Sequence, residues 1–465
     1  MRIELIRLLE RGKKVFLIGI GGIGMSALAR ILESRGLEVS GSDSKRSRTL
    51  ERLETDGIQS TVGHDGSFRD QPDWVVTSSA ISKTNPDLKR AEELGIPVYH
   101  RAEVLSFLTN QVISLAITGA HGKTTCSAMA SFLMTQAGLN PSCAVGGEIL
   151  NFGSNVVIGD PHLYVIEVDE SDRSQLNFYP DFALITNLDS EHLDVYKNLA
   201  DIKSSFKLFI DQVKTTGRLI YCMDNLHLKE IALEAPPGTV NYGLNPTADF
   251  SAKDIVLDGF HSSYVLFEKG EKIDEVRLSI PGIHNVLNSL GVIALLRSFG
   301  LRYEPFLKHT VDFRGAGRRF EVKLNRKELL VIDDYAHHPT EVNATLTAIR
   351  DLGKKTTVVF QPHRFSRTFH LADEFSQVFQ SADRVLLTDI YGAGEDNPNQ
   401  VDVSLIYEAV KKNGHPNVRM IKRDEIIDFL VAHREMEETV AFLGAGDIGE
   451  IADEFASRFE NAYSH

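Results

Sequence analysis

The chain has 465 residues, of which 42% are hydrophobic and 25% charged, and its formal net charge at pH 7 is −14. This composition is typical of a soluble globular protein of roughly two to four domains, and the acidic balance argues against binding to nucleic acid. No apolar run approaches the roughly 20 residues of a membrane span, and the three cysteines are too few for a disulfide framework. We therefore expect a cytoplasmic protein without stable membrane association.

The first block of the chain, residues 1–110, alternates apolar strands with helical stretches. This alternation is typical of a parallel α/β sheet. A helix is predicted over 23–35, and strands are predicted over 15–20, 37–42, 74–77 and 98–99.

A glycine-rich turn follows the first of these strands. Gly19, Gly21, Gly22 and Gly24 form the pattern Gly-Ile-Gly-Gly-Ile-Gly, and Asp43 follows at the end of the next strand. Such a turn presents backbone N–H groups and a helix N-terminus to a diphosphate, and the acidic residue is the usual partner of a ribose. The turn alone predicts either an NAD-dependent dehydrogenase or a protein that binds another diphosphate, such as that of a UDP-sugar.

The second block, residues 111–311, is predicted to be a nucleotide-binding α/β domain with an added β element. The segment 252–280 is broken at Asp258-Gly259 and at Lys269-Gly270, which predicts antiparallel hairpins. Strands are predicted over 112–118, 163–167, 182–186 and 218–221, and helices over 124–137 and 284–299.

The first strand of this block ends in Thr-Gly-Ala-His-Gly-Lys-Thr-Thr, residues 118–125. Backbone N–H groups of such a loop surround phosphate oxygens, Lys123 supplies a positive charge, and the Thr124 or Thr125 hydroxyl can bind Mg²⁺. The usual phosphate loop has a glycine where this chain has Ile117, so the pattern is a shortened one. The loop predicts that the protein uses ATP.

Acidic side chains follow two strands of the same block. Because ligands collect at the carboxyl ends of parallel strands, we expect both groups to converge on the phosphate loop. Mg²⁺ prefers oxygen ligands, so Glu167 and a loop threonine are natural partners, whereas His192 is a softer ligand. The first group contains Glu167, Asp169, Glu170 and Asp172, and the second contains Asn187, Asp189, Glu191, His192 and Asp194.

The third block, residues 312–465, again alternates strands and helices. Arg364 and Arg367 follow its second strand and suit bidentate pairing with a carboxylate. At the end of the second block, Asn285 and Asn288 lie three residues apart on one helical face and can meet a purine edge. In the third block strands are predicted over 329–333, 356–360, 384–388 and 439–443, and helices over 340–352, 371–382, 403–412 and 425–432.

In this order and over nearly the whole chain, the motifs resemble the Mur ligase family, most closely its branch that adds L-alanine. The shortened phosphate loop has the form found in this family. Ala120, Glu191 and Ala336 depart from the family pattern without removing a reacting group. The motifs that carry the resemblance are residues 19–26, 118–125, 167–172, 284–288, 315–320, 333–342 and 360–368.

The resemblance implies an α/β protein of three consecutive domains: a Rossmann-like UDP-binding domain, a central P-loop ATPase domain, and a Rossmann-like C-terminal domain that closes over the site. It implies peptidoglycan precursor synthesis, in which L-alanine is joined to UDP-N-acetylmuramate through an acyl phosphate, with ATP and Mg²⁺. The alternative within the family is a ligase for recycled murein tripeptide. Oligomeric state, and carbamylation of a lysine such as Lys207, stay open.

The resemblance also implies roles for individual residues. Lys123, Glu167 and His192 are expected to be catalytic, and Thr124, Glu167 and His192 to bind the metal. Residues expected at ATP are Gly119, Ala120, His121, Gly122, Lys123, Thr124, Thr125, Asn285, Asn288, Arg319 and Asp334. Residues expected at the UDP-sugar are Gly19, Gly21, Gly22, Gly24, Met25, Ser26 and Asp43. Residues expected at L-alanine are Tyr335, His337, Arg364 and Arg367.

Overall fold

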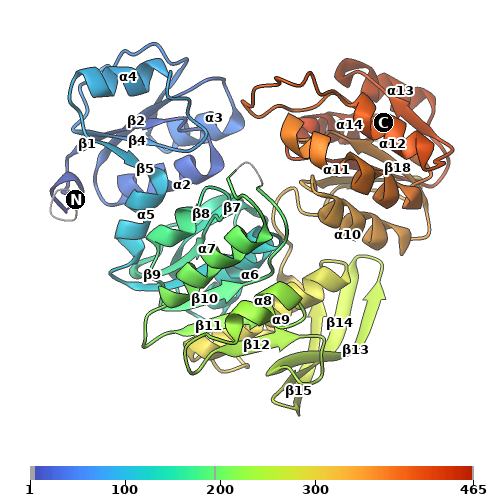
Figure 1. The fold of residues 1–465 in the computed structure, drawn as a ribbon, viewed down its shortest axis with the longest axis horizontal. Helices are drawn as coiled ribbons and strands as arrows, with labels where there is room; N and C mark the ends of the chain where they lie inside the picture. The colour runs from blue at the N-terminus through green and yellow to red at the C-terminus, as the bar shows by residue number, and fades with distance from the viewer. Residues whose placement is uncertain (1–5, 193–194, 463–465) are drawn as a thin grey trace. The chain divides into compact units, whose positions relative to one another are not determined.

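The computed structural model describes residues 6–192 and 195–462. These residues form three β-sheets of five, ten and six strands (Figure 1). By its internal contacts the chain divides into unit 1 (residues 1–253, 266–274 and 287–310) and unit 2 (residues 254–265, 275–286 and 311–465). The predicted α/β fold, with three successive sheets, is confirmed. Within the described ranges, no helix is both long enough and apolar enough to cross a bilayer.

The first sheet is fully parallel, with strand order β3-β2-β1-β4-β5. The order reverses between β1 and β4, which is where open α/β sheets bind their ligands. Strand β1 ends two residues earlier than predicted, because Gly19 turns the chain with φ of +76°. The strands are β1 (Lys14–Ile18), β2 (Glu38–Asp43), β3 (Gln59–Val62), β4 (Trp74–Thr77) and β5 (Val98–His100), and the helices are α2 (Ile23–Ser34), α3 (Arg48–Thr55), α4 (Pro86–Glu93) and α5 (Arg101–Thr109).

The second sheet has the order β15-β14-β13-β12-β11-β10-β6-β9-β7-β8. Its strand β6 lies between β10 and β9 and is parallel to both, so the loop after β6 is flanked by the carboxyl ends of two neighbours. The strands are β6 (Ile113–Thr118), β7 (Pro141–Ile149), β8 (Ser154–Val157), β9 (Asp160–Glu167), β10 (Phe182–Ile185), β11 (Arg218–Cys222), β12 (Val240–Gly243), β13 (Phe250–Asp258), β14 (His261–Glu268) and β15 (Glu271–Leu278).

The added β element has its turns where the sequence predicts them. Lys269 and Gly270 both have positive φ, +51° and +83°, which is the conformation of a two-residue hairpin turn whose twist matches the strands. The helices of this part of the chain are α6 (Lys123–Gln136), η1 (Ser174–Asn177), α7 (Leu199–Asp211), α8 (Leu226–Ala232), α9 (Ile283–Phe299) and η2 (Leu307–Asp312).

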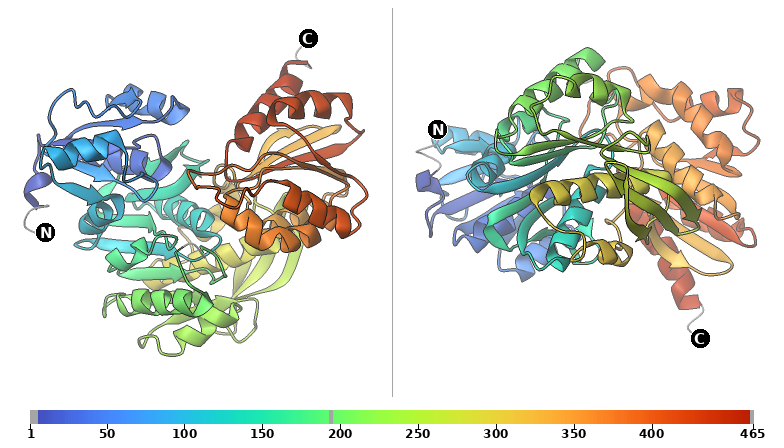
Figure 2. Two further views of the ribbon diagram at one scale, coloured as in Figure 1. Left: turned by 45° about the horizontal axis from the view of Figure 1, so that its top comes forward. Right: turned by 90° about the horizontal axis from the view of Figure 1, so that it is seen from below.

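The third sheet has the order β16-β17-β21-β18-β19-β20, and only β16 is antiparallel to its neighbour among the pairs described. Helices cover both faces of this sheet (Figure 2). Side chains of β17 alternate accordingly, with Leu330 and Ile332 in one apolar cluster and Leu329 and Val331 in the other. The strands are β16 (Glu321–Asn325), β17 (Leu329–Asp334), β18 (Lys355–Phe360), β19 (Arg384–Leu387), β20 (Val418–Met420) and β21 (Glu438–Leu443).

Helix α11 departs most from the prediction in this unit. It spans Phe365–Val378 rather than 371–382, because Arg364 already serves as its N-cap, and η3 (Phe379–Ser381) follows it. The other helices are α10 (Pro339–Arg350), α12 (Ser404–Lys412), η4 (Arg423–Glu425), α13 (Ile426–Ala432) and α14 (Ile448–Ala462).

Candidate active site

The phosphate loop, residues 119–122, joins β6 to α6 and has an unusual backbone conformation. Gly119 and Gly122 have φ of +128° and +85°, and a Cβ added to Gly119 would lie 2.2 Å from Thr186 Oγ1. The carboxyl end of β10 fixes the loop, since Asn187 Oδ1 accepts a hydrogen bond from the His121 N–H at 2.8 Å. The loop therefore requires glycine at both positions, and it presents its backbone and the start of α6 to an anion.

Lys123 lies at the start of α6 and is held by acceptors. Its Nζ donates to Gly119 O at 2.7 Å and Ala120 O at 3.2 Å, and it lies 2.9 Å from the Glu170 carboxylate. Burial alone would lower the pKa of Lys123, but the charges of Glu170, Asp169 and Glu167 raise it above its ordinary value. Lys123 is therefore a fixed cation beside the loop.

Thr124 and Glu167 form the first predicted ligand pair. The Thr124 hydroxyl donates to Glu167 Oε1 at 3.1 Å, and the Gly146 N–H donates to Glu167 Oε2 at 2.7 Å. The structure thus brings together two of the three residues predicted to bind the metal.

His192, the third predicted ligand, belongs to a second group. Its Nε2 lies 3.3 Å from Glu170 Oε1 and 3.7 Å from Glu191 Oε2. Burial would lower the pKa of His192, but the hydrogen bond and charge of Glu170 raise it. Glu191 Oε1 is buried and has no hydrogen-bond partner among the described residues. Glu170, Glu191 and His192 each offer a ligand atom within 4.8 Å of the others, so together they could hold a cation.

The sequence places Glu170 and Glu191 in the acidic groups but does not single them out as site residues. The signal that could have found them is their position after β9 and β10, next to the loop. Asp194 of the same group lies outside the described residues. Lys207 lies on the exposed side of α7 in an ion pair with Glu234, away from the buried face of that helix.

The glycine turn of the first sheet is closed by β2. Both Gly19 and Ile20 donate their N–H groups to Ser42 O, and Gly21 N–H donates to Asp43 Oδ2 at 2.9 Å. Asp43 therefore fixes the turn, which is a role beyond the ribose contact that the sequence predicts for it. The geometry keeps the turn tight in front of helix α2.

Helix α2 starts at the end of this turn, with Gly22 as its N-cap. A Cβ on Gly24 would lie 2.8 Å from the Arg101 guanidinium, so this glycine permits close packing. Met25 and Ser26 are buried, and the Ser26 hydroxyl donates to Ile23 O at 2.9 Å. Their side chains thus belong to the packing of α2.

The two asparagines of α9 have different surroundings. Asn288 faces the phosphate loop, since its Oδ1 would lie 2.5 Å from a Cβ on Gly122 and lies 3.5 Å from Cys126 Sγ. Asn285 Nδ2 donates to Pro281 O at 2.7 Å, at the start of the helix.

In unit 2, Asp334 organises the end of β17. It accepts hydrogen bonds from the Phe320 N–H (3.1 Å), the Ala336 N–H (3.0 Å) and the Thr345 hydroxyl (2.8 Å). Burial raises the pKa of Asp334, with Arg319 opposing that rise. Its side chain is therefore already engaged by the protein.

The residues expected at L-alanine lie close together in unit 2. The Tyr335 and His337 rings lie 5.5 Å apart, the His337 and His363 rings 5.4 Å apart, and Arg367 Nη1 lies 3.1 Å from His363 Nδ1. Arg364 begins α11 with φ of +68°, a strained conformation for a residue with a side chain. His363 is the member of this group that sequence reasoning did not select.

Arginine side chains pack on the same tyrosine. The guanidinium groups of Arg318 and Arg319 lie 5.1 Å and 4.9 Å from the centroid of the Tyr335 ring. This arrangement forms a basic and aromatic group at the carboxyl end of β17.

Comparison with known proteins identifies the class of protein. The descriptions "Mur ligase family, catalytic domain", "Mur ligase middle domain" and "Mur ligase, glutamate ligase domain" match residues 14–112, 117–296 and 318–446. The chain belongs to the Mur ligase family.

Similar proteins match nearly the whole chain. It is 38% identical over 452 residues to a UDP-N-acetylmuramate–L-alanine ligase of Geotalea daltonii, covering 97% of this chain and 99% of the relative. It is 40% identical over 439 residues to one of Carboxydothermus hydrogenoformans, covering 94% and 95%. A solved UDP-N-acetylmuramate-alanine ligase of Thermotoga maritima superposes with a TM-score of 0.84 at 28% identity, covering 97% and 99%. A murein peptide ligase of Psychrobacter arcticus, with a TM-score of 0.74 at 22% identity over 97% and 99%, shares the fold.

Proposed function

We propose that the chain is an ATP-dependent ligase that joins L-alanine to the lactyl carboxylate of UDP-N-acetylmuramate in peptidoglycan precursor synthesis. The observation that carries this proposal is the phosphate loop, with Lys123 fixed against Glu170 at 2.9 Å and Thr124 against Glu167 at 3.1 Å. Full-length similarity to ligases of this specificity supports the choice of L-alanine.

Two groups of side chains suit Mg²⁺ by their donor atoms. Thr124 and Glu167 offer hard oxygen ligands next to the phosphate loop. Glu170, Glu191 and His192 form the other group, in which the unpartnered, buried Glu191 oxygen fits a cation. When bound, Mg²⁺ neutralises developing charge on transferring phosphate oxygens.

The chemistry needs two steps. A lactyl carboxylate oxygen attacks the γ-phosphorus of ATP. The bond between this phosphorus and the bridging oxygen of the β-phosphate breaks, which releases ADP and forms an acyl phosphate. The neutral amine of L-alanine then attacks the acyl carbon, loses a proton, and expels inorganic phosphate. Lys123 supplies positive charge in the first step without a change in its own protonation.

The three substrates are assigned to the three blocks of the chain that the sequence predicts. The UDP-sugar is assigned to 1–110, ATP to 111–311 and the amino acid to 312–465. The residues proposed for the UDP-sugar are Gly19, Gly21, Gly22, Gly24, Met25, Ser26 and Asp43. Those proposed for ATP are Gly119, Ala120, His121, Gly122, Lys123, Thr124, Thr125, Asn285, Asn288, Arg319 and Asp334. Those proposed for L-alanine are Tyr335, His337, Arg364 and Arg367. The burial of Met25 and Ser26 makes their role an indirect one, through the placement of α2.

We further propose a cytoplasmic location, because both ATP and a nucleotide sugar are cytoplasmic substrates. Neither nucleic acid nor a membrane is proposed as a partner.

The test is incubation of the full chain with UDP-N-acetylmuramate, ATP, Mg²⁺ and one amino donor at a time, followed by measurement of the product mass. We expect ADP, phosphate and the alanyl product with L-alanine. Turnover with murein tripeptide but not with L-alanine would overturn the proposed specificity. Reduction of a nicotinamide without ATP hydrolysis would overturn the proposed reaction class.

A further inference from the structure

We propose that Tyr196 is a positioning residue for the candidate cation site of Glu170, Glu191 and His192. It bonds to both loops that carry these three side chains, and so keeps the side chains close enough to share one divalent cation. The inference rests on the proposed function, in which this group suits Mg²⁺, and adds to it a residue that is not itself a ligand.

The three ligands come from two loops that strand pairing does not join. Glu170 follows β9, whereas Glu191 and His192 follow β10. Strand β6 lies between β9 and β10, so these two strands are not neighbours in the sheet. The separation of 3.3 Å between Glu170 Oε1 and His192 Nε2 therefore depends on contacts that the loops themselves make.

Tyr196 makes such contacts with both loops. Its N–H donates to His192 O at 2.9 Å, and its hydroxyl donates to Glu170 O at 2.6 Å. Tyr196 is 1% exposed, so water does not compete for these bonds. One residue thus links the backbone of one ligand-bearing loop to the backbone of the other.

The hydroxyl proton of Tyr196 has a defined direction. Gln175 Nε2 donates to the hydroxyl oxygen at 3.2 Å, and a backbone carbonyl has no proton to donate, so the hydroxyl proton lies on the Glu170 side. Burial raises the pKa of Tyr196, which keeps this proton in place. The ring is held as well, since the Arg173 guanidinium lies 4.7 Å from its centroid and pairs with Asp201 of α7. The neighbours of Tyr196 therefore favour this one arrangement of the link.

The loop after β10 requires such a link. His192 has φ of +56°, in the left-handed region that a residue with a side chain adopts only when its surroundings impose it. Its carbonyl oxygen accepts the N–H groups of Val195 and Tyr196, both at 2.9 Å, and these bonds hold the turn. Groups that orient metal ligands without touching the metal change the metal affinity by about 10- to 100-fold. Tyr196 is such a group for His192 and, through its hydroxyl, for Glu170.

Tyr196→Phe separates positioning from packing. The variant keeps the ring and loses only the hydroxyl. Glu170 O still accepts the Arg173 N–H at 3.1 Å, and Gln175 Nε2 still donates to Ser205 Oγ at 2.9 Å. We expect both loops to stay folded while their relative position is less fixed. A role in packing alone would instead leave the affinity for a cation unchanged.

The experiment measures the binding of Mn²⁺ alone to the full chain, without nucleotide, from the electron paramagnetic resonance signal of free Mn²⁺. Glu191→Gln identifies the site, because it removes the charge of the carboxylate whose buried Oε1 has no hydrogen-bond partner within the described ranges. We expect the wild-type chain to have a Mn²⁺ site that this variant lacks, and Tyr196→Phe to raise the Kd of that site at least about tenfold. Affinity and number of sites are fitted separately, so a loss of folded chain lowers only the number of sites.

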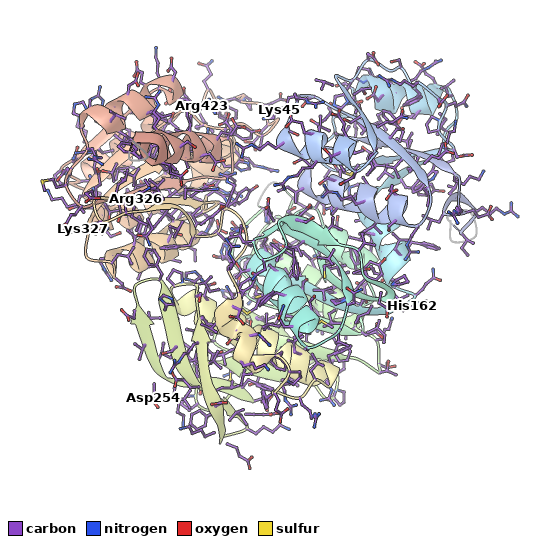
Figure 3. All side chains as sticks on the ribbon, turned by 180° about the vertical axis from the view of Figure 1, so that it is seen from behind. Lys45, His162, Asp254, Arg326, Lys327 and Arg423 are labelled. Carbon is purple, nitrogen blue, oxygen red and sulfur yellow. The ribbon has the colours of Figure 1, made fainter. Side chains whose placement is uncertain are left out.

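Two further variants serve as controls. Tyr164→Phe removes another buried hydroxyl, on β9, which accepts a hydrogen bond from Arg35 Nη2 at 3.1 Å. His162→Ala removes an exposed histidine of the same strand, labelled in Figure 3, and tests for Mn²⁺ bound at surface imidazoles. Both variants should keep the wild-type Kd to within about twofold.

A second measurement uses the complete reaction. With UDP-N-acetylmuramate, ATP and L-alanine, Tyr196→Phe should raise the Mg²⁺ concentration for half-maximal phosphate release at least about tenfold. Its kcat at saturating Mg²⁺ should stay within about threefold of the wild-type value. A purely structural defect would lower kcat and leave the Mg²⁺ dependence unchanged.

Four results would overturn the inference: a wild-type chain without a Mn²⁺ site that Glu191→Gln removes, wild-type Mn²⁺ affinity in Tyr196→Phe, an equal loss of affinity in Tyr164→Phe, or an unchanged Mg²⁺ dependence in Tyr196→Phe. None of them decides the proposed function, which depends on formation of the alanyl product. A chain that makes no alanyl product, but whose Mn²⁺ affinity falls in Tyr196→Phe and not in Tyr164→Phe, would overturn the proposed function and support this inference.

Discussion

Replacement of Lys123 by methionine separates the stabilising role of this residue from its chemical role. Lys123 Nζ lies 2.9 Å from Glu170, and the two side chains are 15% and 4% exposed. Removal of one partner from a buried ion pair costs about 3–5 kcal/mol, and we expect the low end of this range because Asp169 and Glu167 also act on Lys123 and His192 lies beside Glu170. Lys123→Met and Glu170→Gln should each destabilise α6 by about this amount, whereas the double variant should recover at least about 2 kcal/mol.

Activity should not recover with stability. One preorganised positive group or donor contributes about 10²- to 10³-fold to the rate of such a step. Phosphate release should therefore fall at least about a hundredfold in Lys123→Met and stay low in the double variant.

Two measurements suffice for this prediction. Amide hydrogen exchange of peptides from α6 gives the local free energy of opening, and a phosphate-release assay gives the rate. Lys207→Met is the matched control, since Lys207 forms an exposed ion pair with Glu234, and it should change neither quantity. Two results would contradict this prediction: single-substitution effects that add to within about 0.5 kcal/mol in the double variant, or phosphate release by Lys123→Met at the wild-type rate.

Three further predictions concern the loop, the metal and pH. Gly122→Ala should raise the KM for ATP at least about tenfold, because its Cβ would lie 2.5 Å from Asn288 Oδ1. Glu167→Gln should raise the Mg²⁺ concentration for half-maximal rate by about 10- to 100-fold, measured by Mg²⁺ titration of phosphate release. Burial raises the pKa of Asp333 to about 6, against the opposing charge of Arg318. Since this folded-state pKa exceeds the unfolded value, the contribution of Asp333 to stability is complete below about pH 4 and is lost as pH rises to about 6. Stability of the wild-type chain relative to Asp333→Asn should thus fall by about 3 kcal/mol between pH 4 and 7, measured by hydrogen exchange of β17 peptides.

Each of these predictions has a control or a contradicting result. Gly270 has φ of +83°, close to that of Gly122, and no neighbour within 4 Å of an added Cβ, so Gly270→Ala isolates backbone strain and should leave the KM for ATP unchanged. Glu148→Gln removes a half-exposed carboxylate of β7 and should leave the Mg²⁺ titration unchanged. A stability difference between wild type and Asp333→Asn that is constant from pH 4 to 7 would contradict the effect of burial.

The sequence predicts best those elements whose signals are local. An apolar run followed by glycines and a helix is recognisable at β1 and at β6, and both turns are found where expected. Strand β3, with the sequence Gln-Ser-Thr-Val, was not predicted because it has neither an apolar run nor a strict alternation. The hairpin of β7 and β8 was missed because its pairing contains a register shift and is set by contacts with β9.

The same distinction holds for the candidate site. Lys123, Thr124 and Glu167 could be selected because motif spacing and strand ends predict their convergence. The association of His192 with Glu170 and Glu191, rather than with Glu167, depends on loop conformation after β9 and β10, and His192 itself has φ of +56°.

The central claim is amide formation through an acyl phosphate at the Lys123 loop, and oxygen transfer tests it most directly. UDP-N-acetylmuramate labelled with ¹⁸O at both oxygens of the lactyl carboxylate is incubated with ATP, Mg²⁺ and L-alanine, and the released phosphate is analysed by mass spectrometry. We predict one ¹⁸O atom in each phosphate, in step with formation of the alanyl product. Phosphate without label, or phosphate release that yields no alanyl product, would contradict the account.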